Sequence, residues 1–113
     1  MDDCIFCKII AGEIPSQRVF EDDDVFAFRD INPQAPVHIL IVPKRHIPSV
    51  ADLNAENSRY AAKCLEAAAE IAREEGLAGG FRVISNTGAD SGQTVFHLHF
   101  HLLGGKALGE RLI

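Results

Sequence analysis

The chain has 113 residues, with eleven basic and sixteen acidic residues, and a formal net charge of -5. This length fits one domain spanning residues 1–113, and a hydrophobic content of 47% excludes disorder as its main state. The acidic balance argues against a nucleic-acid coat or a membrane-binding arm, and no apolar run reaches the roughly 20 residues that cross a bilayer.

The N-terminus and the cysteine content indicate a reducing compartment. The first seven residues hold two acids and no long apolar run, which is unlike a secretory signal. Three cysteines cannot form a complete disulfide framework. We therefore predict a cytoplasmic protein, in which Cys64 is a small buried hydrophobe within an alanine-rich segment.

The first third of the chain predicts a short helix and a hairpin. Residues 4–14 place isoleucines and a phenylalanine at helical spacing, and Gly12 with Pro15 ends this helix. Short β-runs at 18–21 and 25–29 flank three consecutive aspartates, which suit a hairpin turn.

The middle of the chain predicts a loop, a buried strand and a long helix. Two prolines make residues 30–36 a loop, and the nearly continuous apolar run 38–42 predicts a strand covered on both faces. We expect Asp52 or Asn54 to cap a helix that ends at Gly76. Its apolar stripe comprises Tyr60, Ala61, Cys64, Leu65, Ala68, Ile71 and Ala72.

Two further strands complete the predicted domain. They span 81–86 and 95–103, and a glycine-containing loop at 87–92 separates them. Strands, then a long helix, then strands with short connections predict an α+β fold with a five-stranded antiparallel sheet, one long helix and a short N-terminal helix.

Three histidines alternate with apolar residues in the last predicted strand. Because every second residue of a strand points to the same face, His97, His99 and His101 should project together. The apolar residues between them should pack against the alanine-rich helix. The histidines then face away from that core or into a cleft.

A row of imidazoles suits phosphoryl or nucleotidyl transfer. Imidazole is available near neutral pH both as a nucleophile and as a proton donor. A neutral ring can attack phosphorus while a charged neighbour holds the phosphate oxygens, and the middle residue, His99, is best placed as the nucleophile. Two other interpretations stay open: two of the three histidines bind a metal, or the row is an exposed polar face.

Four separated segments resemble the histidine triad (HIT) family. Residues 97–103 match its signature of histidines alternating with apolar residues, and 30–38, 42–47 and 92–96 resemble three further stretches in the same order. The likeness runs from about Cys4 to Gly105 and is greatest to the Hint-like branch, the purine nucleoside phosphoramidases.

The resemblance implies a HIT-like fold that forms a homodimer with a ten-stranded sheet. It implies hydrolysis at the α-phosphorus of purine nucleoside phosphoramidates or related nucleotidyl conjugates. The reaction would pass through a nucleotidyl-histidine intermediate on His99, release AMP or GMP and need no catalytic metal. The alternatives are a non-catalytic nucleotide-binding scaffold and a metal-dependent hydrolase with the triad as ligands.

Individual roles also follow from the resemblance. His101 would hold phosphate oxygens, and His38 would sit beside the nucleophile and orient it. Gln93 and Thr94 would contact the phosphate and the leaving group, Thr94 through its hydroxyl. Asp30 would take the ribose hydroxyls, and the apolar residues of the set would form the slot for the base. The implied substrate-binding set is Ile5, Phe6, Ile9, Phe28, Asp30, Ile31, Leu40, Asn86, Gln93, Thr94, His99 and His101.

Cys4 and Cys7 form a C-x-x-C pair whose chemistry the sequence leaves open. Such a pair fits zinc binding, thiol redox chemistry or plain surface cysteines, and zinc would need two further ligands from histidine. The resemblance to bacterial-type relatives implies a structural zinc held together with His46 and His97. This site would tie the N-terminal helix to the sheet.

Overall fold

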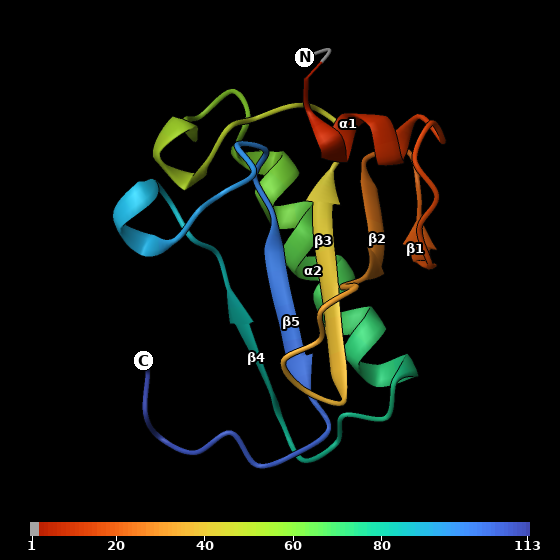
Figure 1. Ribbon diagram of the computed structural model, residues 1–113, viewed down its shortest axis with the longest axis vertical. Coiled ribbons are helices and arrows are strands. Elements are labelled where there is room, and N and C mark those ends of the chain that lie inside the picture. The colour runs from red at the N-terminus through yellow and green to blue at the C-terminus, as the bar shows by residue number, and fades with distance from the viewer. Residues whose placement is uncertain (1–2) are drawn as a thin grey trace.

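A computed structural model describes residues 3–113 and contains one five-stranded antiparallel sheet in the order β1-β2-β3-β5-β4 (Figure 1). Met1 and Asp2 lie outside the described residues. They belong to the N-terminal stretch that we predict not to be an export signal. The strands are β1 (Arg18–Glu21), β2 (Val25–Arg29), β3 (Val37–Pro43), β4 (Phe81–Ile84) and β5 (Phe100–Gly104). The helices are α1 (Ile5–Ile10) and α2 (Ser58–Glu74), with short 3-10 turns η1 (Val50–Asp52) and η2 (Ala89–Ser91). The predicted α+β fold is confirmed.

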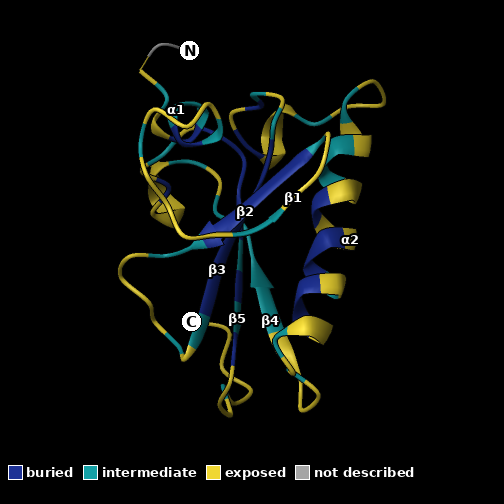
Figure 2. Ribbon diagram, turned by 90° about the vertical axis from the view of Figure 1, so that its right-hand side faces the viewer, coloured by how far each residue is buried: buried dark blue, intermediate teal, exposed yellow. Residues whose placement is uncertain are grey.

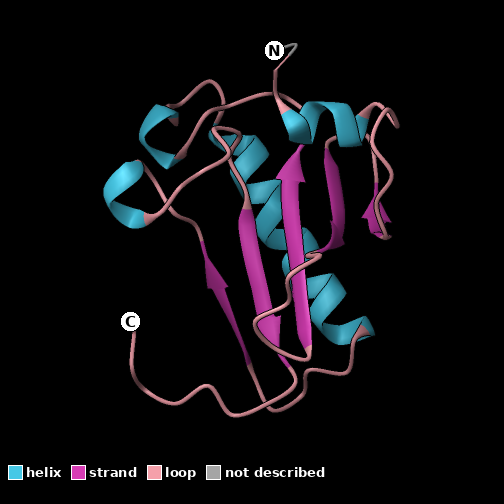
Figure 3. Cartoon of the chain, in the orientation of Figure 1, coloured by secondary structure: helices cyan, strands magenta, loops and turns pink. Residues whose placement is uncertain are grey.

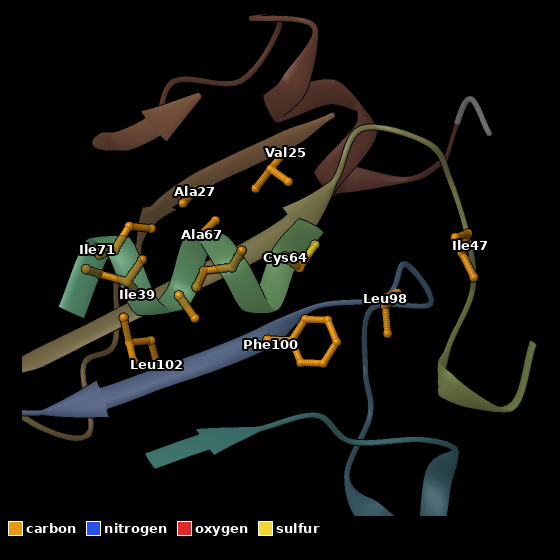
Figure 4. Packing of buried hydrophobic residues seen from close by; sticks show 12 residues of the cluster. Val25, Ala27, Ile39, Ile47, Cys64, Ala67, Ile71, Leu98, Phe100 and Leu102 are labelled. Carbon is orange, nitrogen blue, oxygen red and sulfur yellow. The ribbon is translucent and has the colours of Figure 1, made fainter. Parts of the chain in front are cut away.

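Helix α2 covers one face of the sheet and forms the main core with it (Figure 4). Its sheet-facing residues are small, which lets the helix approach β3 closely, and Cys64 is fully buried among them as predicted. The strand residues facing α2 are Val25, Ala27, Ile39, Ile41, Phe100 and Leu102. Neither helix is long and apolar enough to cross a membrane, within residues 3–113.

Helix α1 lies on the opposite face, across one end of β2 and β3 (Figures 1 and 2). Phe6 and Ile9 of α1 are buried there against Phe28 and Leu40. At this end β3 is therefore covered on both sides, which explains its nearly continuous apolar run. The short helix thus brings the N-terminal segment onto the face that carries the histidines.

Strands β4 and β5 are shorter than predicted. Strand β5 begins at Phe100 rather than at residue 95, and the preceding residues form an extended loop (Figure 3). The ladder between β3 and β5 ends at the pair Ile41 and Phe100, and the N–H of Leu98 donates instead to the carbonyl of Ile47. Strand β4 ends at Ile84, where the Ser85 hydroxyl donates to the main-chain oxygen of His99.

The start of the long helix was also predicted wrongly. Helix α2 begins at Ser58, and its N-cap residue, Asn57, makes no side-chain cap bond. Asn54 accepts bonds from the main chain of Glu56 and Asn57, forming a turn before the helix, while Asp52 accepts from the hydroxyl of Ser49. Both predicted caps therefore stabilise the approach to the helix instead of its first turn.

Leu65 lies outside the buried stripe in which it was predicted, with 48% of its surface exposed. Helix α2 packs mainly on β3 and β2, so a residue on the flank toward β4 has no strand beneath it. The remaining positions of the stripe pack against the sheet, as the periodicity predicted.

Gly76 ends α2 as predicted, and we expect Gly76→Ala to destabilise the protein by about 1–2 kcal/mol. Its φ is 72°, and the next residue, Leu77, donates from its N–H to the carbonyl of Ala72. An alanine Cβ would meet no atom there, so the cost arises from the left-handed backbone. Urea unfolding measures it, with Gly79→Ala as the control. Gly79 has equal space and no positive φ, so equal losses in both variants would contradict the assignment.

Candidate functional site

The three histidines of the triad lie on the face opposite α2. Leu98, Phe100 and Leu102 belong to the core under α2, so the alternation persists even though β5 begins only at Phe100. The rings of His99 and His101 are 5.1 Å apart between centroids. Phe6 of α1 contacts the rings of both His97 and His99 edge-on. The row divides into two groups, because His97 takes part in a different cluster from the other two.

His99 is held in one tautomer by the main chain. Its Nδ1 lies 2.8 Å from the carbonyl oxygen of His97, and a carbonyl can only accept, so the ring proton is on Nδ1. The other nitrogen, Nε2, then carries the lone pair. The side chain is 8% exposed, and its main-chain oxygen is fixed by the Ser85 hydroxyl. This is the arrangement that a nucleophilic imidazole requires.

His38 contacts His101 rather than the predicted nucleophile. His38 Nε2 lies 2.9 Å from His101 Nδ1 and 3.4 Å from the Asp30 carboxylate. Burial, together with the neighbouring His99 and His38 rings, lowers the pKa of His101 to about 4, although the charge of Asp30 opposes the shift. The expected charged neighbour is therefore a neutral ring near pH 7, which acts through an N–H rather than through a positive charge.

Gln93 is buried and supports the loop before the triad. Its side-chain nitrogen donates to the carbonyls of Pro48 and Val95, and its side-chain oxygen accepts from the N–H of Gly88. Both amide hydrogens have partners inside the protein. The predicted role at a phosphate would therefore require one of these bonds to open, whereas the present bonds hold the loop in place.

Thr94 and Asn86 lie in the connection between β4 and the triad. Thr94 is exposed and Asn86, two residues beyond β4, is half-buried. Thr94 borders a hollow of about 350 Å³ whose other lining residues are Asp3, Cys4, Ile5, His46, Val95 and Phe96. The hydroxyl of Thr94 is thus open to a ligand approaching from outside.

The predicted apolar slot for a base divides into a packed part and an exposed part. Four of its residues are buried together in one cluster: Phe6, Ile9, Phe28 and Leu40. Ile5 and Ile31 are exposed, with 44% and 98% of their surfaces accessible. The structure therefore brings the first four together and leaves the last two facing solvent.

A second cluster unites the cysteine pair with two histidines. The ligand atoms of Cys4, Cys7, His46 and His97 all lie within 4.8 Å of one another, close enough to bind a metal ion. Three of the four sulfur–nitrogen pairs measure 3.3–3.5 Å, and the two Nδ1 atoms are 3.1 Å apart. Ligands about 2.0–2.3 Å from one tetrahedral zinc ion stand about 3.3–3.8 Å from each other. The spacing therefore fits one small ion.

The protonation of this cluster also fits a cation. Nε2 of His97 lies 2.8 Å from the carbonyl oxygen of Pro43 and must donate to it, so Nδ1 presents a lone pair toward the two sulfurs. Burial and the adjacent Cys4 raise the pKa of the Cys7 thiol to about 11. A bound cation would offset this cost by stabilising the thiolates.

Asp30, His38 and His101 form another close group of metal-ligand types. The main-chain N–H of Gln34 donates to Nδ1 of His38 at 3.0 Å, so a neutral His38 keeps its proton on Nε2. That protonated nitrogen faces the other two residues and cannot ligate an ion. The group is better described as a hydrogen-bond network, which argues against a metal ion held by these three residues.

Several functional contacts were missed because they come from the main chain. The N–H of Gln34 and the carbonyls of Pro43 and His97 each set the proton of one histidine. Every residue except proline offers the same two groups, so no residue type signals such a role. The hydroxyl of Ser85, at the end of β4, was a side-chain signal that could have been used.

The comparisons with known proteins define the class. A family model for the HIT domain matches residues 11–108, and the chain belongs to the HIT family. It is 52% identical to the purine nucleoside phosphoramidase of Escherichia coli strain K12 over 112 residues, which cover 98% of this chain and 94% of that protein. It is 49% identical to protein HitA of Neisseria gonorrhoeae, with coverage of 92% and 97%.

Solved structures agree with this assignment. A HIT family hydrolase from Clostridium thermocellum matches with a TM-score of 0.98 at 47% identity, covering 100% of this chain and 99% of that one. A histidine triad protein from Clostridium difficile matches with a TM-score of 0.94 at 50% identity, covering 98% and 97%. The family and the fold expected from the sequence are confirmed.

Proposed function

We propose that this protein hydrolyses purine nucleoside phosphoramidates, or related nucleotidyl conjugates, at the α-phosphorus through an intermediate on His99. The observation that carries the proposal is the bond from His99 Nδ1 to the carbonyl of His97, because it leaves Nε2 free as a nucleophile. The name of the Escherichia coli relative supports the choice of substrate class. His101 provides an N–H donor beside the nucleophile.

The reaction proceeds in two steps. Nε2 of His99 bonds to phosphorus while the bond from phosphorus to the amine breaks, and the amine keeps the electron pair and takes a proton from solvent. The proton remains on Nδ1 and is still donated to the carbonyl of His97. This hydrogen bond stabilises the positive charge of the nucleotidylated ring. Water then attacks phosphorus and loses a proton, the bond to Nε2 breaks, and the nucleoside monophosphate (AMP or GMP) leaves.

The remaining predicted residues surround this centre. The cluster of Phe6, Ile9, Phe28 and Leu40 lies beside His99 and offers an apolar surface to a purine base. Asp30, at the end of β2, would accept bonds from the ribose hydroxyls, and Thr94 would donate at the phosphate or the leaving group. These placements come from the family resemblance and are consistent with the exposure of Thr94 and the partial exposure of Asp30.

An adenosine phosphoramidate provides the direct test. We expect the protein to release AMP from it, and an acid-quenched reaction to contain protein with the mass of one added nucleoside monophosphate. AMP binding without turnover would instead indicate a non-catalytic scaffold. Turnover that a strong chelator stops at once, before the fold is lost, would indicate a metal-dependent hydrolase and overturn the histidine mechanism.

We also propose that Cys4, Cys7, His46 and His97 hold a structural zinc ion. Two thiolates and two imidazoles in a closed, tetrahedral set are ligands that zinc prefers. The ion would join the residue before α1 to the loop after β3 and to the triad segment. All three cysteines are free, which agrees with the predicted cytoplasmic location.

We propose further that two chains pair through β4, giving a ten-stranded sheet. Strand β4 is an edge of the sheet, and unpaired edge groups readily pair with another strand. Apolar residues lie beside this edge. Phe81 of β4 is 45% exposed and borders a hollow together with Ala69 of α2. Ala69 follows the exposed Leu65 by one helical turn. A partner chain would cover these residues, which explains why the helix periodicity includes Leu65.

Leu65→Glu should convert a dimer into a monomer, as measured by light scattering. A charge at this position would be buried without a partner in the paired form. Lys63→Glu is the matched control, because it introduces the same residue on the other flank of α2, where it is exposed. A wild-type protein with the mass of one chain, or equal dissociation of both variants, would contradict the pairing.

A further inference from the structure

The main chain of the loop between β2 and β3 sets the proton position on His38. The N–H of Gln34 lies 3.0 Å from His38 Nδ1 and can only donate, so this nitrogen carries the lone pair and the ring proton lies on Nε2. His38 is buried, and burial lowers its pKa even though the charge of Asp30 opposes the shift. A second proton on Nδ1 would also point at the N–H of Gln34. His38 therefore offers a single donor, at Nε2.

Two acceptors compete for this proton. His101 Nδ1 is 2.9 Å from His38 Nε2, and the Asp30 oxygen Oδ2 is 3.4 Å from it. The other carboxylate oxygen of Asp30 is already occupied, because it accepts the N–H of Asn32 at 2.7 Å. Oδ2 is therefore the oxygen that can accept a hydrogen bond either from His38 or from a ligand.

The choice of acceptor determines what His101 can do. When His38 donates to Nδ1 of His101, the proton of the neutral His101 ring must lie on Nε2. That nitrogen is on the other side of the ring and can donate to a phosphate oxygen. When the His38 ring instead directs its Nε2–H toward Asp30, no hydrogen bond holds His101 in this tautomer. In a fraction of the molecules His101 then carries its proton on Nδ1 and has no N–H donor at Nε2.

We propose that His38 is a positioning residue that fixes the tautomer of His101. Asp30 makes this tautomer depend on whether a ribose is bound. Hydroxyls of the ribose donate to Oδ2 of Asp30, which releases the His38 proton to His101. Binding of the correct sugar thus completes the phosphate-binding group. The inference rests on the proposed function, because the ribose at Asp30 and the phosphate at His101 belong to it.

Nuclear magnetic resonance tests the tautomer without any activity. In ¹⁵N-labelled wild-type protein we expect His101 to carry its proton on Nε2, and a coupling between His38 Nε2 and His101 Nδ1 across the hydrogen bond. AMP should strengthen this coupling, and 2′,3′-dideoxy-AMP should not. A His101 proton on Nδ1, or the same response to both nucleotides, would overturn the proposal.

His38→Gln separates positioning from simple support of the fold. A glutamine amide can still donate to Nδ1 of His101, so His101 should keep its Nε2 proton in His38→Gln. In His38→Ala the preference should be lost, and kcat should fall by about tenfold or more while KM changes less. If His38→Ala does not fold, the tautomer of His101 in wild type and in His38→Gln still tests the proposal, because both proteins should carry the proton on Nε2. Equal kinetics of alanine and glutamine variants would contradict it.

Asp30→Asn tests the coupling to the sugar. The asparagine oxygen can keep the bond to Asn32, while its NH₂ group cannot accept the His38 proton, so His101 should hold its tautomer permanently. In wild type, removing both ribose hydroxyls from an adenosine phosphoramidate should lower kcat by about tenfold and raise KM. In Asp30→Asn the same removal should leave kcat unchanged.

The outcomes distinguish this inference from the proposed function. An equal loss of kcat in wild type and Asp30→Asn would overturn the coupling while leaving the hydrolase activity intact. If the wild-type protein does not turn over an adenosine phosphoramidate at all, the proposed function fails. The nitrogen coupling with AMP and with 2′,3′-dideoxy-AMP then decides the inference on its own.

Discussion

Replacing His99 with alanine should lower kcat for an adenosine phosphoramidate by about 10⁴-fold or more, because the variant cannot form the covalent intermediate. AMP should still bind with an affinity within about threefold of wild type, since the apolar cluster and His101 remain. Turnover assays, calorimetry with AMP and the mass of acid-quenched protein measure the three effects. The nucleotidyl adduct should be absent in the variant.

Ser85→Ala is the matched control for this experiment. It removes the hydroxyl that holds the main-chain oxygen of His99 but keeps the imidazole and its bond to the carbonyl of His97. We expect a loss of less than about tenfold in kcat, because one hydrogen bond to a neutral group is involved. Substantial turnover or an adduct in His99→Ala would show that another residue is the nucleophile.

Cys4→Ser should remove the bound zinc and lower the melting temperature by on the order of 10 °C or more. Binding of an ion to the folded state alone stabilises it, and a four-ligand set that loses one thiolate holds zinc much more weakly. Part of the activity should remain, because His97 still donates to Pro43 and its carbonyl still orients His99. Metal analysis of the purified protein and thermal unfolding measure both effects.

Cys64→Ala separates loss of the metal from loss of a thiol. Cys64 is buried under α2 and takes no part in the cluster, so this variant should keep one zinc ion per chain. Any destabilisation in it reflects core packing. A wild-type protein that is free of metal and whose Cys4 and Cys7 thiols react fully would contradict the zinc site.

Local patterns predicted most of the secondary structure. The strands at 18–21 and 25–29 were predicted with the bounds that the structure has, because clear turn signals flank short β-runs. The errors in the last two strands lie where a contact distant in sequence ends the element. The bond of Leu98 to Ile47 and that of Ser85 to His99 shorten β5 and β4, and neither partner is visible in a local window.

The amino-acid sequence alone indicated many of the side chains that meet. Pleating placed the triad on one face, the cysteine pair needed two histidines, and the family resemblance named His46 and His97 before their contacts were known. The tertiary structure decided which nitrogen of His38, His97 and His99 holds the ring proton, and that His38 forms a hydrogen bond with His101. These choices depend on main-chain groups of Gln34, Pro43 and His97, which every residue type offers alike and only the folded chain aims.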